Sequence, residues 1–221
     1  MRIALIMLAA GNSRRFGSNK LLYEIDGKPM YQHILDKLLA VAQKLEEKES
    51  GSLEDHKRQN EESDRRSAGT ACTKIKGTEL TVVTQYDEIE QEAGLSGVRV
   101  YMNPHPDEGI SSSLKIGLKA NLDADACLFS VSDQPWLTAD TIEKLIELLQ
   151  TSGKGIACVS CQGKLGNPCI FTKKYYEELL AVTGDKGGKS VIRAQKDDTA
   201  VLDVGNAKEL TDVDRKIDFT N

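Results

Sequence analysis

The chain of 221 residues contains no apolar run as long as the roughly 18 residues that a membrane-spanning helix requires. It also lacks the basic excess that is typical of nucleic-acid-binding proteins, because its formal net charge is −5. The apolar stretch behind Met1 is too short for the core of a signal peptide, and no cleavage site follows it. We therefore expect a cytoplasmic protein that binds neither a membrane nor nucleic acid.

Patterns for disulfides and metal clusters are also missing. The five cysteines are an odd number without the spacing of a disulfide framework, and the three histidines form no metal-spaced cluster. Cys158 and Cys161 form a single C-x-x-C pair in a segment typical of a strand, without the second ligand pair that a structural zinc site needs. We expect ordinary buried or partly buried thiols.

The N-terminal region lacks the two best-known nucleotide-binding loops. An apolar segment, 3–8, is typical of a buried strand, and the sequence AAGNSRRFGSNK follows it. This sequence contains neither the G-x-G-x-x-G of dinucleotide-binding domains nor the GK[ST] of P-loops. It instead combines a small-residue turn with the cations Arg14, Arg15 and Lys20. Free amides and cations at the carboxyl end of a strand suit a polyphosphate, so we predict a nucleoside triphosphate site; the alternative is an ordinary turn with solvated basic residues.

Apolar strand-like runs alternate with helical patterns along most of the chain, which predicts an α/β fold with a largely parallel sheet covered by helices. Strands are expected at 3–8, 80–84, 98–101, 126–131, 155–161, 169–171 and 199–204. Helices are expected from Pro29 onward, over 112–122, after the N-cap Thr138 and over 173–182.

Residues 44–77 differ from the rest, because they are rich in charged and small polar residues and nearly free of apolar ones before Ile75. Such a composition does not bury enough surface to offset the entropy of ordering. We predict one domain over 1–221 with a charged, mobile surface insertion at 44–77 that begins as an extension of the preceding helix. The alternative is a docking segment for a partner.

An aspartate, Asp133, follows the central apolar strand and precedes Gln134 and Pro135. A carboxylate at this edge can hold Mg²⁺, which takes one or two protein carboxylates together with phosphate oxygens. The alternative is an Asx turn before a proline. Asp214 is a candidate second carboxylate, and Asp203 competes for that role.

Three further segments suit substrates. The proline-bounded loop 103–109 runs into a helix whose hydroxyls, Ser113 among them, either cap that helix or contact a base or ribose. The glycine-rich segments 166–168 and 184–189 are expected to be loops that suit the pocket of a second substrate, with Lys186 and Lys189 available for an anionic group.

Taken together, these motifs resemble those of the nucleotidyltransferases that attach a nucleotide to molybdopterin. Residues 8–17 with Lys20 resemble the signature of that family, and 132–135 resemble its metal-binding motif. The other similar segments are 103–104, 109–114, 166–168 and 184–187. The resemblance covers almost everything outside the insertion, and it implies a three-layer, Rossmann-like (GT-A-like) nucleotidyltransferase fold with a mostly parallel mixed sheet.

Within that family, the segment 9–11 looks like the Ala-Ala-Gly of the cytidylyltransferase branch, whereas guanylyltransferases tend to carry Ala-Gly-Gly. The resemblance implies Mg²⁺-dependent transfer of CMP from CTP to molybdopterin, or molybdenum cofactor, for a client molybdenum hydroxylase, with release of pyrophosphate. The implied catalytic residues are Arg15, Lys20 and Asp133, and the implied metal ligands are Asp133 and Asp214. Nucleotide-binding residues would be Leu8, Ala9, Ala10, Gly11, Ser13, Arg15, Lys20 and Ser113, and the second substrate would meet Asn167, Pro168, Asp185 and Lys186.

The chain departs from the family pattern at Ser132, where glycine or alanine is commoner, in its long insertion, and at 212–216, where Thr-Pro-Glu-Asp usually follows the aspartate. Two alternative functions stay open. One is a sugar-phosphate or alditol-phosphate nucleotidyltransferase. The other is a non-catalytic accessory protein that binds the nucleotide and delivers cofactor to a hydroxylase.

Overall fold

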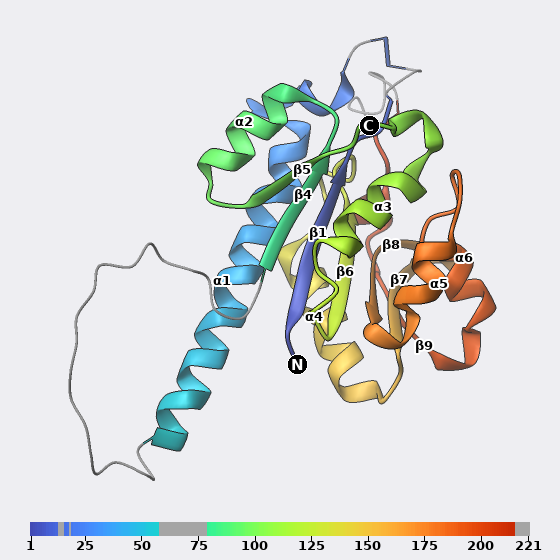
Figure 1. Ribbon diagram of the computed structural model, residues 1–221. Coiled ribbons are helices and arrows are strands. Elements are labelled where there is room, and N and C mark those ends of the chain that lie inside the picture. Colours follow the sequence, from blue (N-terminus) through green and yellow to red (C-terminus); the bar gives the residue numbers. More distant parts are fainter. Residues whose placement is uncertain (13–15, 18, 58–78, 215–221) are drawn as a thin grey trace.

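The computed structural model describes residues 1–12, 16–17, 19–57 and 79–214, and a seven-stranded mixed sheet forms its centre (Figure 1). The strand order is β5-β4-β1-β6-β8-β7-β9. Neighbouring strands are parallel except that β8 runs antiparallel to both β6 and β7. The strands are β1 (Ile3–Ala9), β4 (Glu79–Thr84), β5 (Arg99–Met102), β6 (Ala126–Val131), β7 (Ile156–Cys161), β8 (Lys164–Thr172) and β9 (Thr199–Asp203). A separate two-stranded sheet pairs β2 (Glu24–Ile25) with β3 (Lys28–Pro29).

Helices cover both faces of the sheet, which gives the expected three layers (Figure 1). One face carries α1 (Met30–Lys57), α2 (Asp87–Leu95) and α4 (Ala139–Ser152), and the other carries α3 (Ile110–Lys119), α5 (Tyr176–Ala181) and α6 (Lys189–Ala194). Helix α3 lies close to the sheet because Gly117 faces it. A Cβ at that position would lie 2.5 Å from Cγ2 of Ile6.

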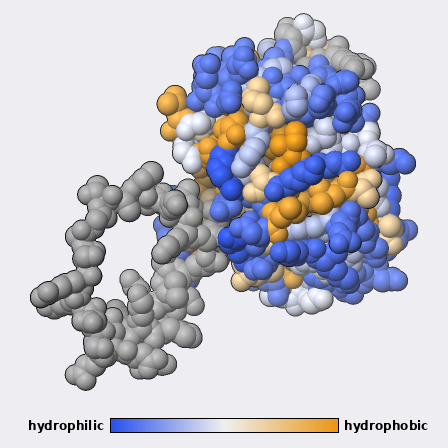
Figure 2. All heavy atoms as spheres, viewed as in Figure 1, coloured by the Kyte–Doolittle hydropathy of each residue, from blue (hydrophilic) through white to orange (hydrophobic). Residues whose placement is uncertain are grey.

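The core has two halves that meet at β1. Alternate side chains of this strand point to opposite faces, so Leu5 and Met7 join one apolar cluster while Ile6 and Leu8 join the other. All seven residues of β1 are buried, as a parallel strand covered on both faces requires. On the outer surface, hydrophilic residues predominate, with bands of apolar residues between them on the face seen in Figure 2. No helix of the described residues is long and apolar enough to cross a membrane.

The first part of the predicted charged insertion belongs to helix α1. Helix α1 continues to Lys57, so residues 44–57 are helical, as the prediction of a helix extension required. Lys44 anchors this part of the helix, because its Nζ lies 2.7 Å from Oε1 of Glu143 on α4. Residues 58–78, which include all the rest of the predicted insertion, lie outside the described residues.

The expectation that Gly166-Asn167-Pro168 forms a loop was wrong, because these residues lie inside β8. The pairing of β7 with β8 shifts register between Cys158 and Ser160, opposite this triplet. A bulge of this kind tolerates a proline, which has no N–H for the ladder, and a glycine, so the segment interrupts the pairing without ending the strand.

Smaller differences concern helix ends. The helix expected over 112–122 spans Ile110–Lys119, and the one expected over 173–182 divides into a 3₁₀ turn at Lys173–Tyr175 and α5. The predicted N-cap is confirmed, because Oγ1 of Thr138 accepts a hydrogen bond from the N–H of Thr141 at 3.2 Å. The four described cysteines are free thiols, three of them buried, as expected.

Candidate active site

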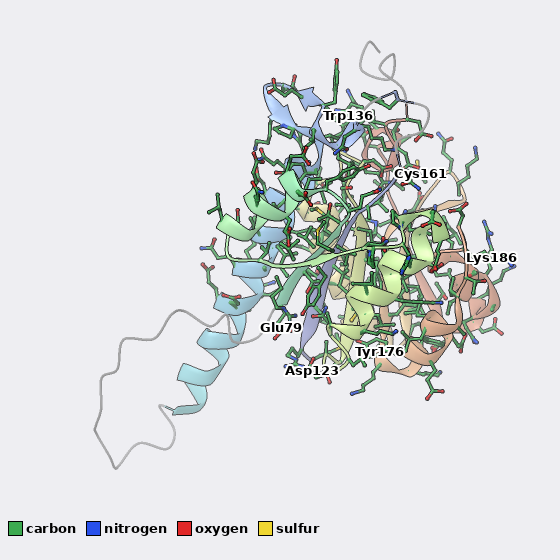
Figure 3. All side chains as sticks on the ribbon, turned by 45° about the horizontal axis from the view of Figure 1, so that its top comes forward. Glu79, Asp123, Trp136, Cys161, Tyr176 and Lys186 are labelled. Carbon is green, nitrogen blue, oxygen red and sulfur yellow. The ribbon has the colours of Figure 1, made fainter. Side chains whose placement is uncertain are left out.

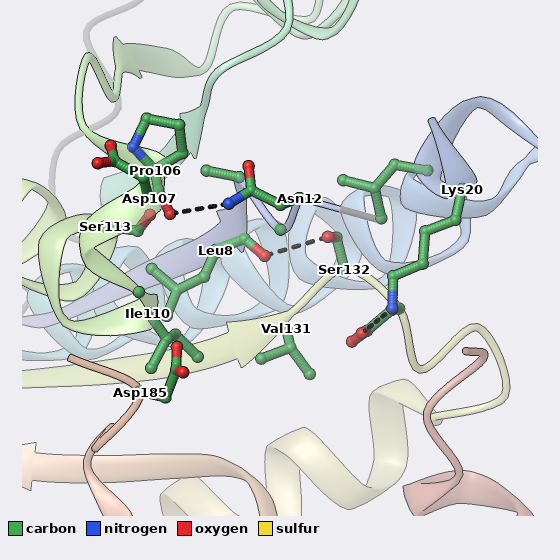
Figure 4. Close-up of a pocket in the computed structure, with 15 residues that line it drawn as sticks. Leu8, Asn12, Lys20, Pro106, Asp107, Ile110, Ser113, Val131, Ser132 and Asp185 are labelled. Carbon is green, nitrogen blue, oxygen red and sulfur yellow. Dashed lines mark hydrogen bonds and ion pairs between the residues drawn. The ribbon is translucent and has the colours of Figure 1, made fainter. Parts of the chain in front are cut away.

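The carboxyl ends of β1 and β6 lie side by side, since Leu8 pairs with Val131. Ser132 ties the following loop to β1, because both its N–H and its Oγ donate to the carbonyl of Leu8, at 3.2 and 3.0 Å. Ligands of open α/β sheets bind at such an edge. A cavity of about 340 Å³ opens there (Figure 4), lined by Leu8, Ala10, Gly11, Asn12, Lys20, Leu21, Pro106, Asp107, Gly109, Ile110, Ser113, Val131, Ser132, Asp133 and Asp185.

One wall of this cavity carries a buried lysine with two carboxylates. Nζ of Lys20 lies 2.7 Å from Oδ2 of Asp133 and 3.2 Å from Oδ1 of Asp214, and it donates to the carbonyl of Val213 at 3.1 Å. Only 7% of Lys20 is exposed. Burial disfavours its charge, but the two carboxylates outweigh that effect, and the pKa of Lys20 is raised. The ammonium group is therefore held charged in the cavity wall.

The C-terminal segment reaches this wall because it is bonded to the loop after β6. The N–H of Val213 donates to the carbonyl of Asp133 at 2.9 Å, and Nε2 of Gln134 donates to Oδ1 of Asp212 at 2.8 Å. Val213 itself is fully buried in the core. These bonds bring Asp214 to Lys20, whereas the competing candidate Asp203 accepts a hydrogen bond from Ser160 and does not line the cavity.

The donor set around Nζ of Lys20 fits a hard divalent cation. Among the described residues, it includes two carboxylate oxygens and one carbonyl oxygen. In the described part of the chain, no three or more His, Cys, Asp or Glu residues group in a way that could hold a metal alone. Asp133 and Asp214 would thus need further oxygen ligands, such as phosphate oxygens, to complete a site for Mg²⁺ or a similar ion.

The loop after β1 forms the adjoining wall. Ala10 and Gly11 line the cavity, whereas Ala9 is fully buried behind it and its carbonyl accepts from Oγ1 of Thr84. Nδ2 of Asn12 donates across the cavity mouth to the carbonyl of Pro106 at 3.2 Å (Figure 4). The sequence analysis missed this contact, because no motif links Asn12 to a loop 94 residues away. The candidates Ser13 and Arg15 lie outside the described residues.

A second cavity of about 320 Å³ adjoins the first and shares Leu8, Ile110, Val131 and Asp185 with it. The remaining residues that line it are Leu114, Phe129, Asn167, Cys169, Lys186, Gly187, Gly188, Lys189, Ser190 and Arg193. Three of the four candidates for the second substrate therefore line this cavity, and Pro168 does not. Arg193 was missed, although its spacing of four from Lys189 on α6 places both side chains on one helix face.

Gly109 brings the two substrate segments together. Its φ of +85° lies in the region that favours glycine, and a Cβ there would meet Oδ1 of Asp185 at 2.5 Å. The N–H of Ser111 donates to the carbonyl of Gly184 at 3.1 Å. The predicted loop 184–189 is thus fixed against the start of α3. In Figure 3, Trp136, Cys161 and Lys186 lie toward one end of the sheet, and Glu79 and Asp123 mark the opposite end.

This arrangement places the molecule among the α/β domains that bind nucleotides at the carboxyl edge of the sheet. Residues 5–199 match the family model of the MobA-like NTP transferase domain. The chain therefore belongs to the MobA-like NTP transferase family, as its motifs indicated.

Two curated relatives are similar in sequence. A protein of Pyrococcus horikoshii named probable molybdenum cofactor guanylyltransferase is 28% identical over 159 residues, which span 72% of this chain and 62% of that protein. The purine catabolism protein PucB of Bacillus subtilis is 25% identical over 218 residues, which span 95% of this chain and 90% of PucB.

A solved structure supports the fold. The crystal structure of Rv0371c from Mycobacterium tuberculosis matches with a TM-score of 0.73 and 20% identity, covering 100% of this chain and 96% of the other. A second crystal structure of that protein, which matches with a TM-score of 0.63 and 18% identity over 93% of this chain and 90% of that one, is a complex with manganese.

Proposed function

We propose that the protein is a divalent-metal-dependent nucleotidyltransferase that transfers CMP from CTP to molybdopterin, or molybdenum cofactor, and releases pyrophosphate. The observation that carries this proposal is that Gly11, Lys20 and Asp133 line one cavity, and that this cavity joins a second, basic one. The first suits a triphosphate and the second a phosphorylated acceptor. The name of the Pyrococcus relative supports the molybdenum cofactor as acceptor.

In this mechanism the protein positions two reactants and stabilises charge, and it performs no covalent chemistry of its own. The amides around Gly11 face the triphosphate, with Arg15 as a further cation from the same loop. The ammonium of Lys20 offsets charge that develops on the departing pyrophosphate. Asp133 and Asp214 would hold the divalent ion, which would supply positive charge to the phosphate oxygens.

The second cavity is proposed to hold the acceptor. Lys186, Lys189 and Arg193 line it, and Asn167 adds an amide. Three cations beside a cavity suit a phosphate group, which in molybdopterin is also the nucleophile. Because Asp185 lines both cavities, an acceptor phosphate bound here would lie next to the nucleotide.

The choice of CTP rests on Ala10, which lines the nucleotide cavity and whose methyl group would crowd a purine. GTP is the second candidate donor, since the Pyrococcus relative is named a guanylyltransferase. Thermal shifts with a divalent metal and each of CTP, GTP and ATP test this choice. Equal stabilisation by GTP would contradict the selection of cytosine.

The reaction itself is tested by incubation with CTP, Mg²⁺ and molybdopterin, followed by mass analysis for molybdopterin cytosine dinucleotide. Pyrophosphate release with a sugar phosphate but not with molybdopterin would instead support the sugar-phosphate nucleotidyltransferase. Binding of CTP and molybdopterin without pyrophosphate release would support the accessory protein. Parallel reactions with MnCl₂ and with EDTA define the metal requirement.

A further inference from the structure

A buried asparagine behind the nucleotide cavity has every polar atom of its side chain engaged. Asn103 follows β5 and is 3% exposed, and its N–H donates to the carbonyl of Thr84. Its Oδ1 accepts from the N–H of His105 at 2.9 Å. Since a backbone N–H can only donate, this bond fixes which end of the amide carries oxygen. Nδ2 must therefore face the opposite side, where two serine hydroxyls lie.

Nδ2 of Asn103 donates to Oγ of Ser112 at 2.8 Å and to Oγ of Ser113 at 2.9 Å. The two hydroxyls differ in whether their protons are donated to another group of the protein. Ser112 donates its proton to the carbonyl of Gly109 at 3.0 Å, so this proton is already used at the start of α3. None of the hydrogen bonds found among the described residues uses the proton of Ser113.

Ser113 lines the nucleotide cavity, on the side of Pro106 and Asp107 and away from Lys20 (Figure 4). Its oxygen accepts from Nδ2 of Asn103, and its proton is used by no hydrogen bond among the described residues, so the hydroxyl can donate that proton into the cavity. We propose that Asn103 is a positioning residue that fixes the Ser113 hydroxyl as a hydrogen-bond donor to a carbonyl oxygen of the nucleotide base. Such an oxygen is O2 in cytosine and O6 in guanine. This inference rests on the proposed function for the presence of a nucleotide.

The substitution Asn103→Asp tests directly which partner must donate in the hydrogen bond between Asn103 and Ser113. It replaces Nδ2 by an acceptor and leaves an oxygen for the N–H of His105, with almost no change in shape. Ser113 would then donate to the new carboxylate and lose its proton for the base. We expect CTP to bind 10- to 100-fold more weakly by calorimetry, which corresponds to about 1.4–2.8 kcal/mol. The KM for CTP rises, while kcat and the KM for the acceptor stay within about twofold.

Ser113→Ala is the second variant, in case Asn103→Asp folds poorly, and it should weaken CTP binding to a similar extent. In the Ser113→Ala background, Asn103→Asp should add nothing to that loss. Ser112→Ala is the matched control, because Ser112 contacts the same amide but donates its proton to the carbonyl of Gly109. In this variant, CTP affinity should stay within twofold. CTP with sulfur in place of O2 should bind the wild type more weakly than CTP and bind Ser113→Ala equally well.

Several outcomes overturn the inference. Wild-type CTP affinity in Asn103→Asp or in Ser113→Ala would do so, and so would an equal loss in Ser112→Ala. If the wild type prefers GTP, the same variants are measured with GTP and 6-thio-GTP under the same criteria. If CTP binds as expected but no dinucleotide forms with molybdopterin, the proposed reaction fails while the role of Asn103 stands. Absence of binding of both nucleotides overturns both.

Discussion

Lys20 and Asp133 are 113 residues apart in the sequence and form an ion pair of 2.7 Å on the cavity wall. The side chain of Lys20 is 9% exposed and that of Asp133 is 22% exposed, so solvent screens the pair less than an ion pair on the surface. The pair joins the loop after β1 to the loop after β6. It therefore holds together the two sides of the proposed triphosphate site.

Asp133→Asn should lower kcat by about 10²–10³-fold, the range reported for losing one group that stabilises developing charge. The amide keeps the shape but loses the charge that holds a divalent ion. Stability should fall by only about 1–2 kcal/mol, because Lys20 keeps Asp214 and the carbonyl of Val213. Steady-state kinetics at saturating metal, with thermal midpoints, measure both effects. Asp203→Asn is the control, and unchanged turnover in Asp133→Asn would remove this aspartate from the mechanism.

Lys20→Met should leave Asp133 and Asp214 facing each other without their shared cation, and should lower stability by about 2–4 kcal/mol. Adding Asp214→Asn to this variant removes one of the repelling charges. The double variant should therefore be more stable than Lys20→Met alone. Urea unfolding of the four proteins in this cycle gives the coupling energy, and strict additivity would show that Lys20 and Asp214 do not interact in solution.

The order of strands and helices was predictable because each element has its own local pattern. The uninterrupted apolar run of β1 and the N-cap Thr138 are two such signals. Residues 166–168 were misassigned because Gly and Pro are typical of loops, and only the pairing partner shows that they form a bulge in β8. A single strand cannot reveal the register of its neighbour.

The chemistry of the site was easier to predict than its contacts. Asp133 was placed by its position after an apolar strand. The second ion pair of Lys20, with Asp214, depends on how the C-terminal segment folds back, and the burial of Val213 directs that return. The contact of Asn12 with Pro106 and the two bonds from Asn103 join segments through side chains whose partners no local sequence pattern specifies. Such contacts follow from tertiary packing.

Gly109→Ala should disrupt the start of α3. The new Cβ would lie 2.5 Å from Oδ1 of Asp185 and 2.6 Å from the carbonyl carbon of Gly184, at a φ of +85°. We expect a loss of about 2–4 kcal/mol and at least 10-fold weaker binding of both substrates, because Ile110 and Asp185 at this contact line both cavities. Gly184→Ala is the control: its φ is also positive, at +64°, but a Cβ there meets nothing within 4 Å, so only about 1 kcal/mol of backbone strain remains.

Lys186→Ala and Arg193→Ala should affect the acceptor and not the nucleotide, because both residues line only the second cavity. The KM for molybdopterin should rise about 5- to 20-fold for each, as expected for one charge-assisted contact to a phosphate, with the KM for CTP unchanged. Lys119→Ala, on an exposed position of α3 outside both cavities, should change neither value. A rise in the KM for CTP alone would assign the second cavity to the nucleotide.

Asp198 gives the protein a defined response to acid. Tyr175 donates to its Oδ2 at 2.5 Å, Lys174 at 2.9 Å, and the N–H of Gly155 bonds Oδ1, which lowers the pKa of Asp198 from 3.8 to about 2. A pKa below that of the unfolded chain means that the native state binds its proton more weakly. The stabilisation is therefore fully present above about pH 4 and is lost as the pH falls through about 2.

Asp198→Asn should thus lower stability at pH 7 by about 1 kcal/mol, a value reduced for the partial exposure of the carboxylate, or about 2–4 °C in melting temperature. The gap between wild type and variant should narrow as the pH falls from 4 toward 2, because the wild-type carboxylate is then protonated as well. Thermal unfolding followed by circular dichroism from pH 7 to pH 2.5 measures this gap. Asp197→Asn changes the adjacent exposed residue, whose carboxylate makes no hydrogen bond with the described residues, and should leave the melting temperature unchanged throughout. A gap that stays constant down to pH 2.5 would mean that the bonds from Tyr175 and Lys174 do not depend on the charge of Asp198.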